Sequence, residues 1–296
     1  MSEYNGIIIM DKPTGCSSHR CVSIARRALN MRKIGHTGTL DPAASGVLPL
    51  LIGNATRAAD FLTLDNKRYS ATVLLGTITD TYDMDGQILR KNNVDISVGE
   101  LTAAVKSFVG ETEQLPPMYS AISVGGQRLY NLARQGIEVE RKKRKITIYS
   151  IDIVSINLPE VVLDVHCSKG TYIRSLAYDI GEKLKCGGCI KALRRTLSGT
   201  FDIKDAISPE KLMRLSENGN AESVIIPTDS VFANFSRIDL DKKTAQRVKN
   251  GVPVYYKAQM GVTYRVYDEN GCFIALSRGD EEDKKSCLRL VKGFYG

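Results

Sequence analysis

The stretch Gly35-His36-Thr37-Gly38-Thr39-Leu40-Asp41-Pro42-Ala43-Ala44-Ser45-Gly46 is the most informative part of this chain. Its glycines and its proline predict a loop, and the apolar run Val47 to Ile52 that follows predicts a buried strand. Loops held by a rigid sheet often carry reactive side chains, and this one offers the imidazole of His36 and the carboxylate of Asp41. Taken alone, Asp41 fits a turn residue that bonds its own backbone. Its neighbourhood makes it a candidate site.

Strands and helices are predicted in irregular order on both sides of this loop. Apolar runs and period-two patterns predict strands over residues 6–10, 47–52, 69–78, 146–156 and 161–167. Helical spacing and end signals predict helices that begin after Ser17 or Ser18, after Ser97 with Glu100, and after Ser208, and others over residues 55–62, 128–134 and 171–185. Because these elements do not form regular βαβ units, we expect an α+β fold with a mixed sheet.

The texture of the sequence changes near Phe232. A short helix over residues 242–249 is followed by strand-like sequence, with a hairpin turn predicted at Glu269-Asn270-Gly271. We therefore divide the chain into a large domain, residues 1–231, and a small β-rich domain, residues 232–296.

The charge balance points to a polyanionic partner. The chain has 296 residues, 41 Lys and Arg, 33 Asp and Glu, and a net charge of +8. Residues 114–146 and residues 166–200 each carry seven basic and two acidic side chains, a net charge of +5 apiece. Two such stretches can form a track for phosphates. The alternative is a solvated, solubilising face.

The sequence also argues against several other classes of protein. No apolar run approaches the roughly 18 residues of a membrane-spanning helix, and the N-terminus does not resemble a signal peptide. Seven cysteines spread over the chain fit reduced thiols, so we expect a soluble, cytoplasmic protein. Nucleophile-elbow, phosphate-loop and dinucleotide-binding motifs are absent from the sequence.

Metal sites are not predicted either. Residues 81–92 superficially resemble a calcium loop, but Thr81 and Asn92 stand where its first and last carboxylates belong. The pair Cys186 and Cys189 lacks a second pair at zinc-site spacing, and we predict that both pack within a tight turn.

A set of motifs, all in the same order along the chain, carries a close resemblance to one family. They are Asp11-Lys12-Pro13-Thr14-Gly15, residues 35–42, Lys67-Arg68-Tyr69, residues 79–86 (TDTYDMDG), the segment from Pro116 to Gly136, residues 170–174 (GTYIR) and Leu193-Arg194-Arg195. Together they resemble the TruB family of pseudouridine synthases. The resemblance implies a pseudouridine synthase fold with a mostly antiparallel sheet, an RNA-gripping insertion at about 116–146, and, more weakly, a PUA-like C-terminal domain.

The resemblance also implies an activity and the residues that carry it. The family isomerises the T-loop uridine at position 55 of tRNA to pseudouridine, flips that base out of its stack and uses an essential aspartate. That aspartate corresponds to Asp41, with Arg174 as its guanidinium partner and Tyr69 as the aromatic residue on the target base. Because the uracil is detached and rejoined without redox chemistry, no metal and no cofactor is expected.

Further residues are expected to contact the RNA. The substrate-binding set by resemblance is Lys12, His36, Asp83, Tyr172 and Leu193. Arg141, Lys142, Lys143 and Arg144 are the candidates for contacts with the RNA backbone, the alternative for this run being a solvated hairpin edge.

Three functional hypotheses follow from these residues. The preferred one is a stand-alone monomeric enzyme that acts on the T-arm stem-loop of tRNA and needs no protein partner. The second is a non-catalytic tRNA-binding or folding-assistance protein on the same scaffold. The third is an RNA-guided enzyme that modifies ribosomal RNA together with partner proteins.

Overall fold

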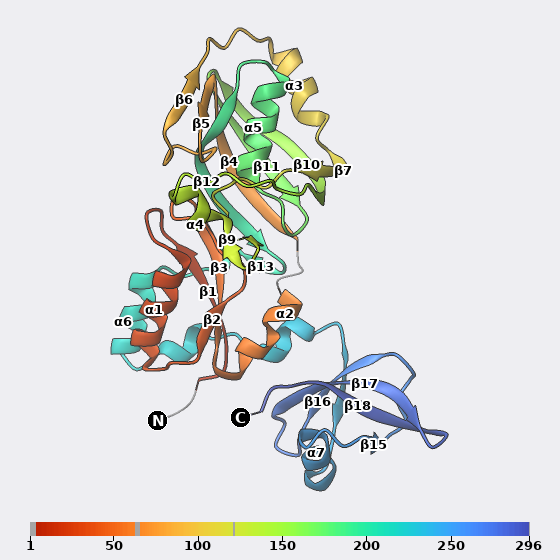
Figure 1. Ribbon diagram of the computed structural model, residues 1–296. Coiled ribbons are helices and arrows are strands. Elements are labelled where there is room, and N and C mark those ends of the chain that lie inside the picture. Colours follow the sequence, from red (N-terminus) through yellow and green to blue (C-terminus); the bar gives the residue numbers. More distant parts are fainter. Residues whose placement is uncertain (1–3, 63–65, 121, 296) are drawn as a thin grey trace.

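The computed structural model describes residues 4–62, 66–120 and 122–295. Figure 1 shows an elongated molecule in which a long sheet spans an upper and a lower half, with a separate small β domain beside the lower half.

One nine-stranded sheet forms the framework. Its main path is β1 (Gly6–Lys12), β3 (Ser45–Ile52), β12 (Gly188–Ser198), β4 (Lys67–Leu75), β11 (Glu160–Cys167), β10 (Arg144–Asn157) and β7 (Gly110–Gln114). The short strands β2 (Ile34–His36) and β13 (Phe201–Asp202) pair with β3 and β12. All these pairings are antiparallel except the short contact between β12 and β3, which is parallel. The predicted α+β fold with a mixed, mostly antiparallel sheet is confirmed.

The strand β12 joins the two halves of the sheet, and the sequence patterns did not predict it. It pairs with β4 along most of its length and then reaches β3 through Arg194 opposite Ser45 and Arg195 opposite Gly46. Its three basic residues hide the apolar alternation that normally marks a strand. Cys189 is the second residue of this strand, so its predicted place in a tight turn was wrong, whereas Cys186 lies in the preceding turn; both are buried free thiols.

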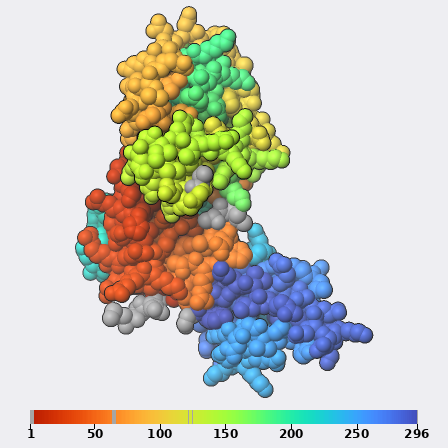
Figure 2. Space-filling view, in the orientation of Figure 1, coloured from red at the N-terminus to blue at the C-terminus, as the bar shows by residue number. Residues whose placement is uncertain are grey.

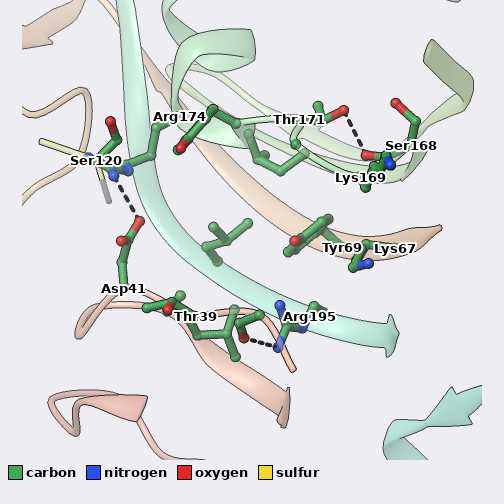
Figure 3. A pocket seen from close by; sticks show the side chains of 17 residues that line it. Thr39, Asp41, Lys67, Tyr69, Ser120, Ser168, Lys169, Thr171, Arg174 and Arg195 are labelled. Atoms are coloured by element: carbon green, nitrogen blue, oxygen red, sulfur yellow. Dashed lines mark hydrogen bonds and ion pairs between the residues drawn. The ribbon is translucent and has the colours of Figure 1, made fainter. Parts of the chain in front are cut away.

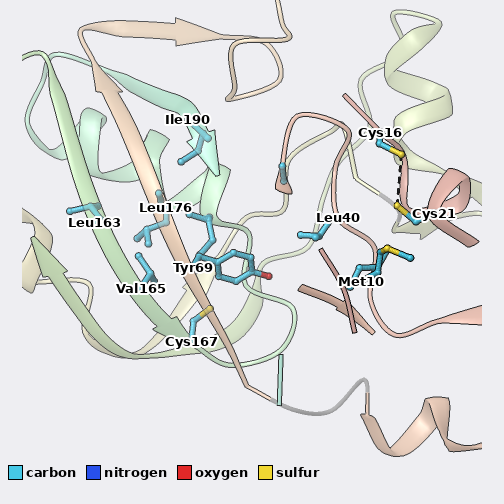
Figure 4. Close-up of a cluster of buried hydrophobic side chains, with 14 of the residues drawn as sticks. Met10, Cys16, Cys21, Leu40, Tyr69, Leu163, Val165, Cys167, Leu176 and Ile190 are labelled. Atoms are coloured by element: carbon cyan, nitrogen blue, oxygen red, sulfur yellow. Dashed lines mark hydrogen bonds between the residues drawn. The ribbon is translucent and has the colours of Figure 1, made fainter. Parts of the chain in front are cut away.

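The predicted helices pack with their apolar faces toward the core. In the lower half, α1 (Ser18–Leu29) packs against α6 (Pro209–Glu217), and in the upper half α5 (Ile173–Lys183) and α3 (Val98–Lys106) lie beside the sheet (Figure 1). The predicted caps are confirmed, because the Ser17 side chain accepts from the Arg20 amide and Ser97 forms a capping box with Glu100. Figure 4 shows part of the main apolar core, with Leu163, Val165 and Leu176 packed beside β4.

Several predicted boundaries were wrong. The strand expected over 69–78 ends at Leu75, and Gly76, with a φ of 78°, turns the chain into β5 (Thr77–Thr79), which pairs with β6 (Ile88–Lys91). Loop 35–46 is shorter than expected, because its ends belong to β2 and β3. The helix expected over 55–62 is a 3₁₀-helix, η1 (Gly53–Ala58), continued by α2 (Ala59–Leu62).

Short elements complete the large domain. The segment before β10 contains β8 (Ser123–Val124), β9 (Gln127–Arg128) and α4 (Leu129–Arg134). Figure 2 shows this yellow-green segment across the front of the molecule, between the orange upper part and the red lower part. Three 3₁₀-helices follow β13, namely η2 (Ile203–Asp205), η3 (Ala221–Val224) and η4 (Thr228–Phe232).

The C-terminal part forms a five-stranded sheet of its own. The order is β14 (Ser236–Asp239), β16 (Thr263–Tyr267), β17 (Phe273–Glu282), β18 (Lys285–Gly293) and β15 (Val254–Tyr255), with α7 (Lys242–Lys249) beside it. An apolar cluster that includes Phe232, Leu276 and Phe294 also contains Ile7 and Ile9 of β1, so the two sheets are packed together. The division at 231/232 stays a prediction. Of the described helices, none is long and apolar enough to span a membrane.

We predict that Gly46→Ala will strongly destabilise the fold. Gly46 has a φ of 104°, and a Cβ there would lie 2.1 Å from the Arg195 carbonyl oxygen on β12. The backbone strain costs about 1–3 kcal/mol, and the clash adds about 1–3 kcal/mol more. The free energy of unfolding, measured in urea, checks this.

Gly110→Ala is the matched control. Gly110 has a similar φ of 114°, and its Cβ would meet nothing within 4 Å. Equal losses in the two variants would show that the close approach of β3 and β12 contributes nothing.

Candidate active site

Hydrogen bonds to the backbone of the loop between β2 and β3 hold this loop in place. The Leu40 amide donates to the Ser18 hydroxyl and that hydroxyl donates to the Leu40 carbonyl, both at 2.9 Å. The Gly15 amide donates to the Pro42 carbonyl at 2.8 Å. Asp41, between these two anchored positions, is therefore held in place before any substrate binds.

Asp41 forms an ion pair with Arg174, which lies in the first turn of α5. Asp41 Oδ2 lies 2.9 Å from Arg174 Nη2, and Figure 3 shows the pair on one side of a cavity. The Arg174 side chain is 5% exposed, and it also donates to the Thr81 carbonyl at 2.8 Å and to the Tyr119 carbonyl at 2.7 Å. Its direction is thus fixed by three other segments of the chain.

Asp83 is the second carboxylate on this guanidinium. Asp83 Oδ2 lies 3.5 Å from Arg174 Nη1, and its other oxygen accepts from the Thr81 hydroxyl at 2.6 Å and the Asp85 amide at 3.1 Å. The carboxylate of this acidic loop, for which no calcium site was predicted, therefore faces the arginine.

The charges around Asp41 act on its pKa in opposite directions. Desolvation by the cavity walls raises the pKa of Asp41 above its ordinary value of 3.8, and Asp83 raises it further. Arg174 opposes both effects by its charge and its hydrogen bond. Without Arg174 this carboxyl would be still harder to ionise.

A cavity of about 310 Å³ opens beside this ion pair. It brings together five of the predicted site residues, namely Asp41, Tyr69, Tyr172, Arg174 and Leu193. Tyr69 and Leu193 come from the neighbouring strands β4 and β12, and Tyr172 precedes α5. A second cavity of about 210 Å³ shares Asp41 and Arg174 and adds Asp83 to its lining.

The structure corrects the role predicted for Lys12. This side chain is fully buried, and its ammonium donates to the carbonyls of Pro13, Cys16 and Pro42. Burial lowers the pKa of Lys12. Because all three donors are engaged with the backbone, Lys12 supports the Asp41 loop and does not contact substrate.

His36 lies outside both cavities. It ends β2, pairs with Leu50, and is half-buried, with its Nδ1 enclosed and without a hydrogen-bond partner among the described residues. Burial lowers the pKa of His36, and the charge of Arg195 lowers it further. A neutral imidazole is therefore favoured on the strand that leads into the site loop.

The basic run at 141–144 divides into two kinds of residue. Arg141 donates to the Pro116 carbonyl at 3.0 Å and its side chain is only 13% exposed, so it closes the insertion and the predicted backbone contact is wrong. Lys142, Lys143 and Arg144 are exposed at the start of β10 and remain predictions.

The sequence patterns missed other residues that line the larger cavity. Among them are Lys67, Ser120, Lys169 and Arg195. For Arg195 a signal existed, because Leu193, Arg195 and Leu197 alternate on one face of a strand. The sequence carries no such signal for Ser120, because its position at the cavity depends on the tertiary fold of the insertion.

Comparisons with known proteins bear on this site. Residues 26–173 match the family model for the N-terminal domain of TruB family pseudouridylate synthases, and residues 174–233 match the model for the C-terminal domain of tRNA pseudouridylate synthase B. A tRNA pseudouridine synthase B of Clostridium perfringens strain 13 is 45% identical over 97% of this chain and 99% of its own. One from Alkaliphilus oremlandii is 48% identical over 85% of this chain and 83% of its own.

Solved structures with the same fold include two complexes that contain Cbf5. The chain matches an archaeal box H/ACA sRNP Nop10-Cbf5 complex with a TM-score of 0.72 and 25% identity, over 99% of this chain and 87% of that chain. A Cbf5-Nop10-Gar1 complex matches with a TM-score of 0.72 and 26% identity, over 98% and 85% of the two chains. The family models, the nearly full-length relatives and the site motifs agree: this chain belongs to the TruB family of pseudouridine synthases.

Proposed function

We propose that this protein isomerises the T-loop uridine at position 55 of tRNA to pseudouridine. The observation that carries the proposal is the ion pair between Asp41 and Arg174 at a cavity walled by Tyr69, Tyr172 and Leu193. The relatives that match over nearly their whole length are tRNA pseudouridine synthases B.

The target nucleotide enters the cavity by leaving its stack in the T-loop. Eversion costs a few kcal/mol, and stacking on an aromatic face returns about 1–3 kcal/mol. Tyr69 supplies that face, and Leu193 and Tyr172 form the other walls. The cavity next to Asp41 then places the glycosidic bond beside the carboxylate.

Asp41 carries the bond exchange in this proposal. The bond between N1 and C1′ breaks, a bond between C5 and C1′ forms, and the C5 proton is lost while N1 gains one. Atoms and electrons therefore balance without redox chemistry, water or a cofactor. Arg174 favours the ionised carboxylate and orients its oxygens, which a lysine without the planar fork cannot do equally well.

Tyr69 has a second role in the proposal. Its phenol lies at the cavity beside the position of the stacked base, and in its ionised form the phenol oxygen accepts the proton that leaves C5 after the new bond forms. Burial raises the pKa of Tyr69, and the charge of Arg195 opposes that effect.

The T-arm backbone is held by the exposed basic side chains of the insertion and of the start of β10. We assign phosphate contacts to Lys142, Lys143 and Arg144 because all three are exposed, and the charge of Arg144 opposes the rise in the pKa of Tyr172 that burial causes. The stand-alone form is favoured over the RNA-guided one, because the relatives matched over nearly their full length are named for tRNA, whereas the H/ACA proteins are 24–26% identical. We propose a cytoplasmic monomer that needs no protein partner.

We predict that Asp41→Asn will lower turnover by about 10⁴-fold or more, as loss of an essential catalytic group does. The assay measures tritium released from C5-labelled uridine in an isolated T-arm stem-loop with no other component. Binding of the stem-loop should persist, because the amide keeps the size of the carboxylate. Asp205→Asn, at an exposed position, is the control.

The outcomes separate the three hypotheses. A wild-type protein that binds the stem-loop without releasing tritium is a binding or folding-assistance protein. A requirement for a guide RNA or a second protein supports the RNA-guided form.

The carboxyl of Asp41 should titrate above the ordinary aspartate value of 3.8. Since activity needs the ionised form, the acid limb of kcat/KM should lie correspondingly high, and activity is lost as pH falls through the raised pKa. Asp83→Asn removes a negative neighbour and should move the pKa of Asp41 downward. The ¹³C chemical shift of the carboxyl measures both, with Asp41→Asn identifying the signal. An unchanged titration in Asp83→Asn contradicts the electrostatic coupling.

Charge reversal at Lys142 and Lys143 to glutamate should weaken RNA binding without lowering turnover at saturating RNA. The slope of log Kd against log salt should fall by about 2, one for each lost phosphate contact. Lys204→Glu with Lys211→Glu, two exposed positions on the lower half, is the matched control. If both double variants lose the same affinity, only the overall charge matters and the phosphate contacts are not there.

A further inference from the structure

Arg195 is a buried cation at the seam of the sheet. It lies in β12, directly opposite Tyr69 of β4 on one side and Gly46 of β3 on the other. Its side chain is among the largest that are fully buried, with 2% of the residue exposed, yet it lines the larger cavity (Figure 3).

The partners of Arg195 are neutral oxygens. Its Nε donates to the Val47 carbonyl at 2.7 Å and its Nη2 donates to the Gly38 carbonyl at 3.2 Å. Tyr69 lies directly opposite it on β4, and the guanidinium lowers the pKa of the Tyr69 phenol. Within the described part of the chain no carboxylate pairs with it, whereas its neighbour Arg194 pairs with Asp11 at 2.8 Å.

A buried guanidinium without a counter-ion is costly, so its retention beside a cavity calls for a negative charge that forms there during the reaction. The Tyr69 oxygen is the group placed to carry it. In Figure 4 the Tyr69 ring lies among apolar side chains of the core and its hydroxyl points away from Leu163, Val165 and Leu176. The phenol is thus open to the cavity and to Arg195.

We propose that Arg195 is a positioning residue that holds the Tyr69 oxygen at the cavity and stabilises its phenolate for removal of the C5 proton. This rests on the proposed function. The phenolate accepts the proton from C5, and the electron pair of that C–H bond restores the C5=C6 double bond of pseudouridine. The former C6=N1 π pair becomes a lone pair on N1, which takes a proton from solvent, and the resulting phenol returns its proton to solvent. The step is balanced and needs no further reactant.

The electrostatics agree with this assignment. Burial raises the pKa of Tyr69, and Arg195 lowers it through both its charge and its hydrogen bond. The planar fork matters as well, because one side chain donates to carbonyls of β3 and of the site loop in fixed directions while it faces Tyr69 of β4. A lysine would keep the charge but lose at least one of these contacts.

The test is a kinetic isotope effect. Single-turnover rates are measured on T-arm stem-loops with protium or deuterium at C5 of the target uridine. Tyr69→Phe should slow the reaction by about 10²–10⁴-fold, the range for loss of a general base, and make proton removal rate-limiting, so that its isotope effect exceeds that of the wild type.

Arg195→Gln should raise the isotope effect in the same direction, and Arg195→Lys should raise it less. Tyr69→3-fluorotyrosine, which carries a more acidic phenol, should restore part of the rate in both Arg195 variants. Arg194→Gln, one residue along the strand, is the matched control and should keep the wild-type isotope effect. Thermal midpoints and RNA affinities show which variants fold. If Arg195→Gln does not fold, Arg195→Lys replaces it as the test variant.

The outcomes distinguish the proposed role of Tyr69 as the base from the proposed role of Arg195 in stabilising its phenolate. If Tyr69→Phe leaves the isotope effect unchanged, Tyr69 does not take the proton, and that part of the proposed function fails together with the role of Arg195. If Tyr69→Phe raises it but the Arg195 variants are slow with the wild-type isotope effect and no rescue by fluorotyrosine, Arg195 supports only the fold and the inference is overturned.

Discussion

The site depends on one guanidinium that binds oxygens of four residues from three separate segments. Arg174 reaches the carboxylate of Asp41 on the β2–β3 loop, the carboxylate of Asp83 and the carbonyl of Thr81 in the acidic loop, and the carbonyl of Tyr119 at the base of the insertion. A buried guanidinium is stable only when its N–H groups donate hydrogen bonds to acceptors in the protein. The same contacts therefore favour the ionised form of Asp41, the catalytic carboxylate in our proposal, and hold the insertion against the site.

The cavity lies where the two halves of the sheet meet, because β12 pairs there with β4 on one side and with β3 on the other. Arg195 stands opposite both Tyr69 of β4 and Gly46 of β3, and the absence of a side chain at Gly46 lets the backbones of β3 and β12 approach. Side chains from both halves then face one space: Tyr69 from β4, Leu193 from β12 and Asp41 from the loop that precedes β3. The Lys12 ammonium donates to three backbone carbonyls, one of them that of Pro42, and so stabilises that loop.

Local signals in the sequence predicted the elements that local chemistry controls. The caps at Ser17, Ser97 and Ser208 and the helix over 242–249 were confirmed, because each depends on neighbours within four residues. These local signals failed where a contact between residues far apart in the sequence determines the structure. β12 forms a strand because β4 and β3 pair with it, despite its basic residues, and Arg141 is drawn from solvent by the carbonyl of Pro116.

The sequence by itself determined the kind of site: a loop with one aspartate, a tyrosine, and an arginine in motifs whose order matches the family. Only the tertiary structure decided which basic side chains belong to that site. Lys12, Arg141 and Lys142 are all cations in the sequence, yet one is fully buried, one closes the insertion and one stays exposed. The physical reason is that the composition fixes the charge of a side chain, whereas its solvation and its partners depend on segments that come together only in the folded chain.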